Sequence, residues 1–264
     1  MSKVMSMIYG VVAYTAFLAS AVYAIGFIGG FGVPKTIDSG VPGDVTSALM
    51  VNAMLLGLFA VQHTGMARQT FKRWITSFIP ASIERSTYVL TSSLTLIVMY
   101  VAWQPMPQVI WNVEGTVARG VIWTMFASGW LIFLAASFMI HHFDLFGLRQ
   151  VWLSMQDKPY TDLGFRTPGF YRFVRHPIQA GFLIAFWSTP TMTLGHLVFS
   201  MATTAYIFIA VLLFEERDLA RNLGETYRSY QRQVYGFLPL RRFEQPRLSG
   251  ARSDDTAPGM RAAA

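Results

Sequence analysis

The sequence predicts an all-α, polytopic transmembrane helical bundle of about five to six spans, which ends in a helical hairpin and a cytoplasmic amphipathic helix. Of the 264 residues, 53% are hydrophobic and only 13% are charged, against about 25% in an ordinary domain. Runs of about 20 mostly apolar residues, each long enough to cross a bilayer, recur along the chain. We therefore interpret residues 1–244 as a single integral membrane domain and residues 245–264, which lack apolar periodicity, as a disordered tail.

Six segments have the length and composition of a membrane span. The first apolar run begins near Val4 and has no small-residue cleavage site, so we expect a retained span rather than a signal peptide. The last two segments form one stretch about twice the length of a span, which we expect to turn near Gly195, with Pro190 kinking its first helix. The predicted spans are residues 6–28, 45–63, 86–104, 119–140, 177–195 and 196–215.

The placement of basic residues supports six spans. With the N-terminus in the cytoplasm, six spans put 19 of the 21 Lys and Arg residues on the cytoplasmic side and leave only Lys35 and Arg119 outside. This is the asymmetry of the positive-inside rule, which a five-span arrangement would break by moving the basic tail to the other side. The sequence therefore predicts that both termini are cytoplasmic, and the net charge of +7 requires no nucleic-acid partner.

Two absences in the sequence narrow the chemistry. The chain has no cysteine, which excludes disulfides, a thiolate nucleophile and cysteine-ligated metals. It also has no G-x-G-x-x-G motif and no glycine-rich phosphate loop, which excludes a Rossmann domain.

Charged residues gather at the open end of the predicted hairpin. Residues 169–177 carry two arginines, a histidine and a tyrosine. These side chains are costly to hold at a membrane boundary, so they indicate a site for an anionic or zwitterionic small molecule. The alternative is that they only anchor the chain at the membrane interface. Because the hairpin returns to the side it left, Glu215 and Glu216 come back level with Arg175 and His176. A carboxylate suits an ammonium or ribose hydroxyls and an arginine suits a carboxylate, which are the groups of an amino-acid-bearing nucleoside such as S-adenosylmethionine.

Residues 216–240 then become amphipathic and charged. Apolar and aromatic residues recur at helical spacing beside arginines, which predicts a cytoplasmic helix lying across the entrance, with Tyr227 and Tyr230 turned inward.

A second polar cluster closes two other spans on the same side. His63 ends the second span, and His142, Asp144 and Arg149 follow the fourth. We expect no metal site, because adjacent helical residues point about 100° apart and cannot both face one ion. We interpret the cluster as catalytic: one histidine accepts a proton, Asp144 holds it in the right tautomer, and Arg149 joins the network; a structural network that seals the bundle is the alternative.

Several motifs follow one another over residues 165–240: Arg175-His176-Pro177-x-x-x-Gly181, Glu215-Glu216-x-x-Leu219, Gly224-x-x-Tyr227-x-x-Tyr230 and Pro239. In order and spacing they resemble the membrane methyltransferases of the isoprenylcysteine carboxyl methyltransferase type. The resemblance implies S-adenosylmethionine as cofactor. That family often has Tyr where this chain has Gln179, so we expect Tyr171 or Phe173 to supply the stacking surface. The implied cofactor-binding residues are Tyr171, Arg175, His176, Pro177, Gln179, Gly181, Glu215, Glu216, Tyr227 and Tyr230.

Motifs elsewhere in the chain extend the resemblance to its whole length. They are Gln62-His63-x-Gly65-Met66-Ala67-Arg68, Glu84-Arg85-Ser86-Thr87-Tyr88, His142-Phe143-Asp144-Leu145-Phe146-Gly147-Leu148-Arg149-Gln150 and Phe186-Trp187-x-Thr189-Pro190-x-Met192-Thr193. In these the chain is similar to bacterial members of the family that methylate methanethiol to dimethyl sulfide. The resemblance implies a small thiol substrate and a place in the bacterial inner membrane.

Three other functions remain open from the sequence. The first is carboxyl methylation of a prenylated cysteine or related lipid with the same cofactor half. The second is a non-catalytic membrane partner, such as a protein that supports nitric oxide reductase. The third is an NADPH-dependent sterol-type reductase, which the Glu215-Glu216 pair disfavours because an adenine-phosphate clamp needs extra basic residues.

Overall fold

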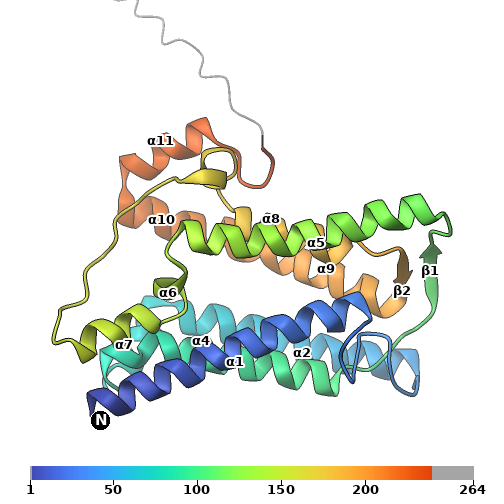
Figure 1. Ribbon diagram of the computed structural model, residues 1–264, viewed down its shortest axis with the longest axis horizontal. Coiled ribbons are helices and arrows are strands. Elements are labelled where there is room, and N and C mark those ends of the chain that lie inside the picture. The colour runs from blue at the N-terminus through green and yellow to red at the C-terminus, as the bar shows by residue number, and fades with distance from the viewer. Residues whose placement is uncertain (1, 240–264) are drawn as a thin grey trace, which may run out of the picture.

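The computed structural model describes residues 2–239 and shows a bundle of antiparallel helices in two layers (Figure 1). One layer packs α4 (Ala81–Ala102) against both α1 (Lys3–Gly29) and α2 (Val45–Ala67). The other packs α5 (Thr116–Met139) against α8 (Pro177–Trp187), and α9 (Leu194–Ile209) follows α8 and also contacts α2. The expected disordered tail, residues 245–264, lies outside the described residues.

Four helices among the described residues are long and apolar enough to cross a membrane. They are α1, α2, α5 and a continuous helix over Leu194–Leu223. The predicted span 86–104 falls on α4, which has 22 residues and is of span length, but is less apolar than these four. The all-α class is therefore confirmed, and the count of spans by length and apolarity is four rather than five or six.

The first arm of the predicted hairpin differs from expectation. Helix α8 has only 11 residues, which rise about 16 Å against about 30 Å of hydrocarbon, and it ends at Trp187 before Pro190. Strand β2 (Thr191–Thr193) follows and pairs antiparallel with β1 (Val109–Asn112) at the far end of the bundle (Figure 1). The expected helix kink at Pro190 is thus wrong, because α8 has already ended there. The chain reverses through an extended segment and α9 begins at Leu194, next to the turn expected near Gly195.

The predicted cytoplasmic helix over 216–240 is two helices. Helix α10 (Glu216–Leu223) continues α9 through a π-helical turn (Ala210–Glu215), and α11 (Glu225–Gln233) follows after a break at Gly224. Gly224 has φ 59° and ψ −133°, a conformation that side-chain-bearing residues avoid. The break turns α11 back over the end of the bundle (Figure 1).

Short helices complete the end of the bundle that carries the N-terminus, α10 and α11, which we call the α10–α11 end (Figure 1). They are α3 (Gln69–Ile75), α6 (His142–Leu145), α7 (Leu148–Met155) and a 3-10 turn (Gly169–Arg172). Helix α7, which follows α5 of the second layer, packs on α1 and α4 of the first layer. It therefore joins the two layers at this end.

Glycines let α5 and α8 approach closely. A Cβ atom on Gly129 would lie 2.6 Å from the Gly181 carbonyl oxygen, and a Cβ atom on Gly181 would lie 2.6 Å from the Gly129 carbonyl oxygen. Small residues at such crossings let helix backbones pack without intervening side chains. An aromatic core that includes Trp130, Phe133 and Phe199 fills the space beside this crossing.

Candidate functional site

The hairpin brings Arg175 and His176 against Glu216, as its antiparallel geometry predicts. The Oε1 atom of Glu216 accepts hydrogen bonds from Arg175 Nε at 2.8 Å and from the Tyr227 hydroxyl at 3.1 Å, and lies 2.5 Å from His176 Nε2. Its Oε2 atom accepts from the side-chain amide of Gln231. We call Arg175, His176, Glu216, Tyr227 and Gln231 the carboxylate knot.

The carboxylate knot is buried and its members satisfy one another. His176 is 2% exposed, Tyr227 1% and Glu216 7%. Arg175 also donates to the carbonyl oxygens of Gln231 and Val234, at 3.2 and 2.5 Å. Since these partners occupy the hydrogen-bonding groups, the knot joins α8, α10 and α11 and leaves little for a ligand.

Charge balance in the knot favours a protonated His176. Burial alone would lower the pKa of His176, but hydrogen bonds to Glu215 and Glu216 outweigh burial and raise that pKa above its ordinary value. Burial, together with the neighbouring Glu216 carboxylate, raises the pKa of Tyr227, so this phenol stays a hydrogen-bond donor.

Glu215 differs from its neighbour because it is accessible. Its side chain is 43% exposed, against 9% for Glu216. Gln179 Nε2 donates to its Oε2 atom at 3.1 Å, and His176 Nδ1 lies 3.6 Å from its Oε1 atom. Glu215 is therefore the carboxylate of the pair that can still bind a ligand ammonium or hydroxyl.

Aromatic side chains stand beside Glu215. Burial and the Glu215 charge both raise the pKa of Tyr171, and the hydroxyl of Tyr230 donates to the Tyr171 carbonyl oxygen. Phe165 contacts the ring of Tyr230 with ring centroids 5.4 Å apart. These rings are half-buried, and stacking of the cofactor on Tyr171 or Phe173 stays a prediction.

Two of the predicted cofactor-binding residues, Pro177 and Gly181, lie where they support the backbone. Pro177 is buried at the first turn of α8, where its fixed φ and missing N–H suit a helix start. Gly181 lies at the α5–α8 crossing against Gly129. Both residues therefore help to place His176 and Gln179, and a contact of their own with the cofactor stays a prediction.

His63 lies in a polar cluster inside the first layer. The Tyr88 hydroxyl is 2.8 Å from His63 Nε2, and Ser92 Oγ is 3.3 Å from His63 Nδ1. Phe59 stacks on the His63 ring at 5.0 Å between centroids. The hydroxyls hold the ring in place, so His63 is a positioned, half-buried imidazole.

The His63 cluster contacts the second layer. Tyr88 lies within electrostatic range of both Glu215 and Tyr206 of the α9 helix. Thr64, the residue after His63, hydrogen-bonds the Tyr206 hydroxyl at 3.0 Å. The His63 cluster is thus joined to α9 through Thr64 and Tyr206, and Tyr88 lies near enough to Glu215 to be affected by its charge.

His142 occupies a different place. Its Nδ1 atom is 2.8 Å from Ser137 Oγ and its Nε2 atom is 2.8 Å from the Tyr14 hydroxyl. The ring is 2% exposed and stacks on Phe138 with centroids 4.2 Å apart. Burial lowers its pKa, so His142 is a neutral link between α1 and the end of α5.

The structure brings Asp144 to Arg149 rather than to a histidine. Arg149 donates to Asp144 at 3.0 Å, and Tyr160 donates to the other carboxylate oxygen at 3.2 Å. The expectation that Asp144 fixes a histidine tautomer is therefore wrong: among the described residues its hydrogen-bond partners are Arg149, Gln150 and Tyr160. Over residues 2–239, no group of three or more His, Asp or Glu side chains could hold a metal ion.

Sequence reasoning missed Tyr88, Ser92 and Tyr206. Tyr88 and Ser92 are four residues apart on α4 and so share a helix face. Hydroxyls repeated at that spacing inside an apolar helix were the available signal, since such side chains tend to face polar groups of the bundle interior.

Two groups of known proteins are among those similar to this chain. Methanethiol S-methyltransferase of Mycobacterium tuberculosis is 52% identical over 239 residues, which cover 90% of this chain and 98% of the relative. Methanethiol S-methyltransferase of Crocosphaera subtropica is 48% identical over 91% of this chain and 94% of the relative. Nurim of Sus scrofa is 27% identical over 62% of this chain and 65% of the Nurim chain. No protein-family model matches the chain, and no solved structure matches it significantly.

Proposed function

The chain belongs to the methanethiol S-methyltransferase family, and from this premise we propose that it methylates methanethiol with S-adenosylmethionine, giving dimethyl sulfide and S-adenosylhomocysteine. The observation that carries the proposal is identity of about half the residues over nearly the whole length of relatives with that name. The site adds a half-exposed carboxylate near aromatic rings, and the first layer adds a positioned histidine.

The residues around Glu215 fit the proposed methyl donor. S-adenosylmethionine supplies a methyl group that is already activated on a sulfonium sulfur. Glu215, held by Gln179 and 43% exposed, suits its ammonium or ribose hydroxyls. The rings of Tyr171 and Tyr230 suit a cation or an aromatic base, because a π face attracts positive charge and stacks on planar groups.

The carboxylate knot supports this donor site from behind. Arg175, His176 and Glu216 fix the start of α8 to α10, and Tyr227 and Gln231 fix α11 over them. Side chains locked by a buried network hold an adjacent site in one geometry, which lowers the entropy cost of aligning two reactants.

His63 is the proposed base. A thiol is a poor nucleophile until it loses its proton, and imidazole is the side chain whose ordinary pKa suits proton transfer near neutral pH. His63 accepts the thiol proton on its unprotonated ring nitrogen, while the Tyr88 hydroxyl, 2.8 Å from Nε2, holds the ring. His142, Asp144 and Arg149 then position the chain at the α10–α11 end rather than touch the substrate.

The proposed orientation puts the α10–α11 end in the cytoplasm of a bacterial inner membrane, with residues 1–244 acting as one domain. The predicted cytoplasmic segments 64–85 and 141–176 contain α3, α6, α7 and the 3-10 turn, which lie at this end with α10 and α11 (Figure 1). Lys35 and Arg119, the two basic residues predicted outside, lie in segments at the opposite end.

Headspace gas chromatography of cells that express the chain tests the function. Cells fed methanethiol should release dimethyl sulfide above an empty-vector control, and extracts should lack carboxyl-methylated prenylcysteine. Formation of the methyl ester without dimethyl sulfide would instead support the carboxyl methyltransferase alternative. Absence of both products, with the protein present in the membrane fraction, would support a non-catalytic partner.

A further inference from the structure

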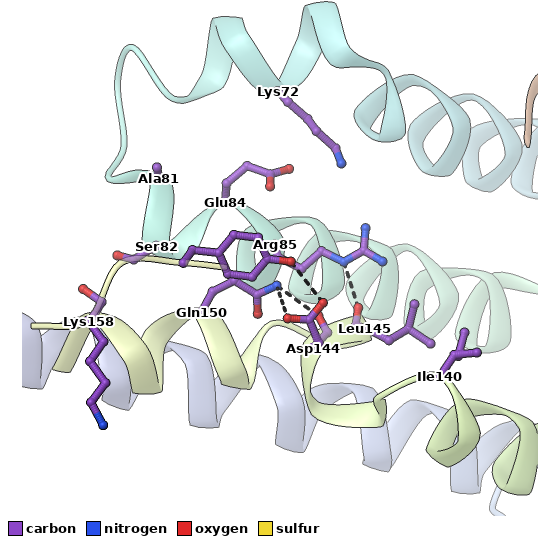
Figure 2. A pocket seen from close by; sticks show the side chains of 12 residues that line it. Lys72, Ala81, Ser82, Glu84, Arg85, Ile140, Asp144, Leu145, Gln150 and Lys158 are labelled. Carbon is purple, nitrogen blue, oxygen red and sulfur yellow. Dashed lines mark hydrogen bonds between the residues drawn. The ribbon is translucent and has the colours of Figure 1, made fainter. Parts of the chain in front are cut away.

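A charged cleft opens between α3–α4 and α6–α7, apart from the carboxylate knot (Figure 2). Its volume is about 570 Å³, enough for a small polar group. Lys72 comes from α3, Glu84 and Arg85 from α4, and Asp144 and Gln150 from the α6–α7 side. Nothing in the proposed methyl transfer uses this cleft.

Positive charge exceeds free negative charge in the cleft, because Lys72, Arg85 and Lys158 line it with Glu84 and with Asp144, which is already paired with Arg149. Among the residues that the structure describes, neither Lys72 nor Arg85 forms an ion pair, whereas Asp144 is paired with Arg149 outside the cleft lining. Arg85 donates only from Nε, to the Leu145 carbonyl oxygen at 2.8 Å. Burial and the nearby Arg85 charge lower the pKa of Lys72, and the Glu84 charge offsets only part of this effect. An anion placed between the two cations would offset this repulsion.

The cleft also offers an unused hydrogen-bond acceptor. The side-chain oxygen of Gln150 is buried and has no hydrogen-bond partner among the described residues. Its amide nitrogen donates to Asp144, which fixes the orientation of the group (Figure 2). A buried acceptor without a partner is costly, and a ligand that carries a hydroxyl beside its anionic group would satisfy it.

Exposed aromatic residues follow Lys72 in the chain and indicate a membrane surface at this end of the bundle. Trp74 is 56% exposed and Phe78 70% exposed, on the segment that leads from α3 into α4. Exposed aromatic side chains at the end of membrane helices are typical of the headgroup region. A basic pocket between helices at that depth is the usual setting of an anionic lipid headgroup.

We propose that this cleft binds the phosphate group of an anionic phospholipid, with Lys72 and Arg85 as its cationic partners. A headgroup hydroxyl donates to Gln150, and the acyl chains leave past Trp74 and Phe78. The same phosphate chemistry could come from a soluble ion, but the exposed Trp74 and Phe78, which follow Lys72 in the chain, favour a lipid. The proposal is independent of the methyl transfer and concerns only the surface around α3 and α7.

Native mass spectrometry of the full-length protein in delipidated detergent tests the proposal. We expect more bound phosphatidylglycerol than phosphatidylcholine at equal concentration. Lys72→Gln should weaken phosphatidylglycerol binding about tenfold or more, the order expected for one lost charge-assisted hydrogen bond. Lys158→Gln is the matched control, because Lys158 lines the same cleft but its ammonium group points away from the other side chains (Figure 2).

Other arms separate the sources of phosphate. Titration calorimetry of the lipid-free protein with inorganic phosphate should show much weaker binding than with phosphatidylglycerol. Equal binding of the two phospholipids, or equal effects of the Lys72→Gln and Lys158→Gln substitutions, would overturn the proposal. So would a loss of S-adenosylhomocysteine affinity in Lys72→Gln, since the cleft would then belong to the methyl donor.

Discussion

Replacing each of two adjacent glutamates by glutamine should separate ligand binding from stability. The carboxylate of Glu215 is accessible, whereas that of Glu216 is enclosed by Arg175 and His176. The substitution Glu→Gln keeps the size of the side chain and removes only its charge. We therefore expect Glu215→Gln to weaken methyl-donor binding and Glu216→Gln to weaken the fold.

The magnitudes follow from burial. A hydrogen bond to a charged group contributes about 1.5–3 kcal/mol, which corresponds to about 10- to 150-fold in affinity. Because 43% of the Glu215 side chain is exposed, solvent screening puts the expected loss near the lower end, at about tenfold. Breaking a buried ion pair from one side costs about 3–5 kcal/mol, and Glu216 is only 7% exposed.

Two measurements on the detergent-purified variants separate these effects. Titration calorimetry with S-adenosylhomocysteine should show the weaker binding in Glu215→Gln while its thermal midpoint stays near that of the unmodified protein. Thermal unfolding should show a clearly lowered midpoint in Glu216→Gln. If Glu215→Gln bound S-adenosylhomocysteine as tightly as the unmodified protein, Glu215 would not be the ligand-binding carboxylate. If Glu216→Gln kept the thermal midpoint of the unmodified protein, Glu216 would not be the stabilising one.

Three further predictions concern pH, the base and helix packing. Because the pKa of His176 is raised, the stabilisation by this residue is complete below about pH 6.5 and is lost as the pH rises through the raised pKa. The thermal midpoint should therefore fall on the alkaline side. His176→Asn should flatten that fall. His63→Ala should lower kcat by about 10²- to 10⁴-fold near neutral pH, with partial recovery at high pH, where the thiolate forms unaided. His142→Ala should mainly lower the thermal midpoint. A pH–rate profile in which His142→Ala loses turnover near neutral pH and His63→Ala does not would exclude His63 as the base. Gly181→Ala should destabilise the protein by about 1–3 kcal/mol, because its Cβ atom would meet the α5 backbone at 2.6 Å, while Gly120→Ala, with open space around it, should have little effect on thermal unfolding.

The meeting of Arg175 and His176 with Glu216 could be predicted from the sequence. A hairpin that turns at one side of the membrane must return its last residues to the level of its first, whatever the details of the turn. The same argument could not predict that Glu216 is enclosed and Glu215 accessible. That difference depends on the π-helical turn over Ala210–Glu215, which shifts the helical phase by a local hydrogen-bond choice that the apolar pattern does not record.

Partners that are distant in the chain were beyond sequence reasoning. One histidine was expected to pair with Asp144, but His142, two residues away, contacts Tyr14, which is 128 residues distant. Charge and proximity in sequence favoured the carboxylate, whereas the packing of α1 against α7 decides the real neighbour. The end of α8 at Trp187 could not be predicted either, because hydropathy alone does not distinguish a buried helix from a buried extended segment.

Transfer of an isotopic label tests the central claim most directly. Purified protein would be given methanethiol and S-adenosylmethionine with a trideuterated methyl group, and the headspace and solution analysed by mass spectrometry. The proposed function predicts trideuterated dimethyl sulfide and an equal amount of S-adenosylhomocysteine. Unlabelled dimethyl sulfide, or no dimethyl sulfide from protein that still binds S-adenosylhomocysteine, would contradict it.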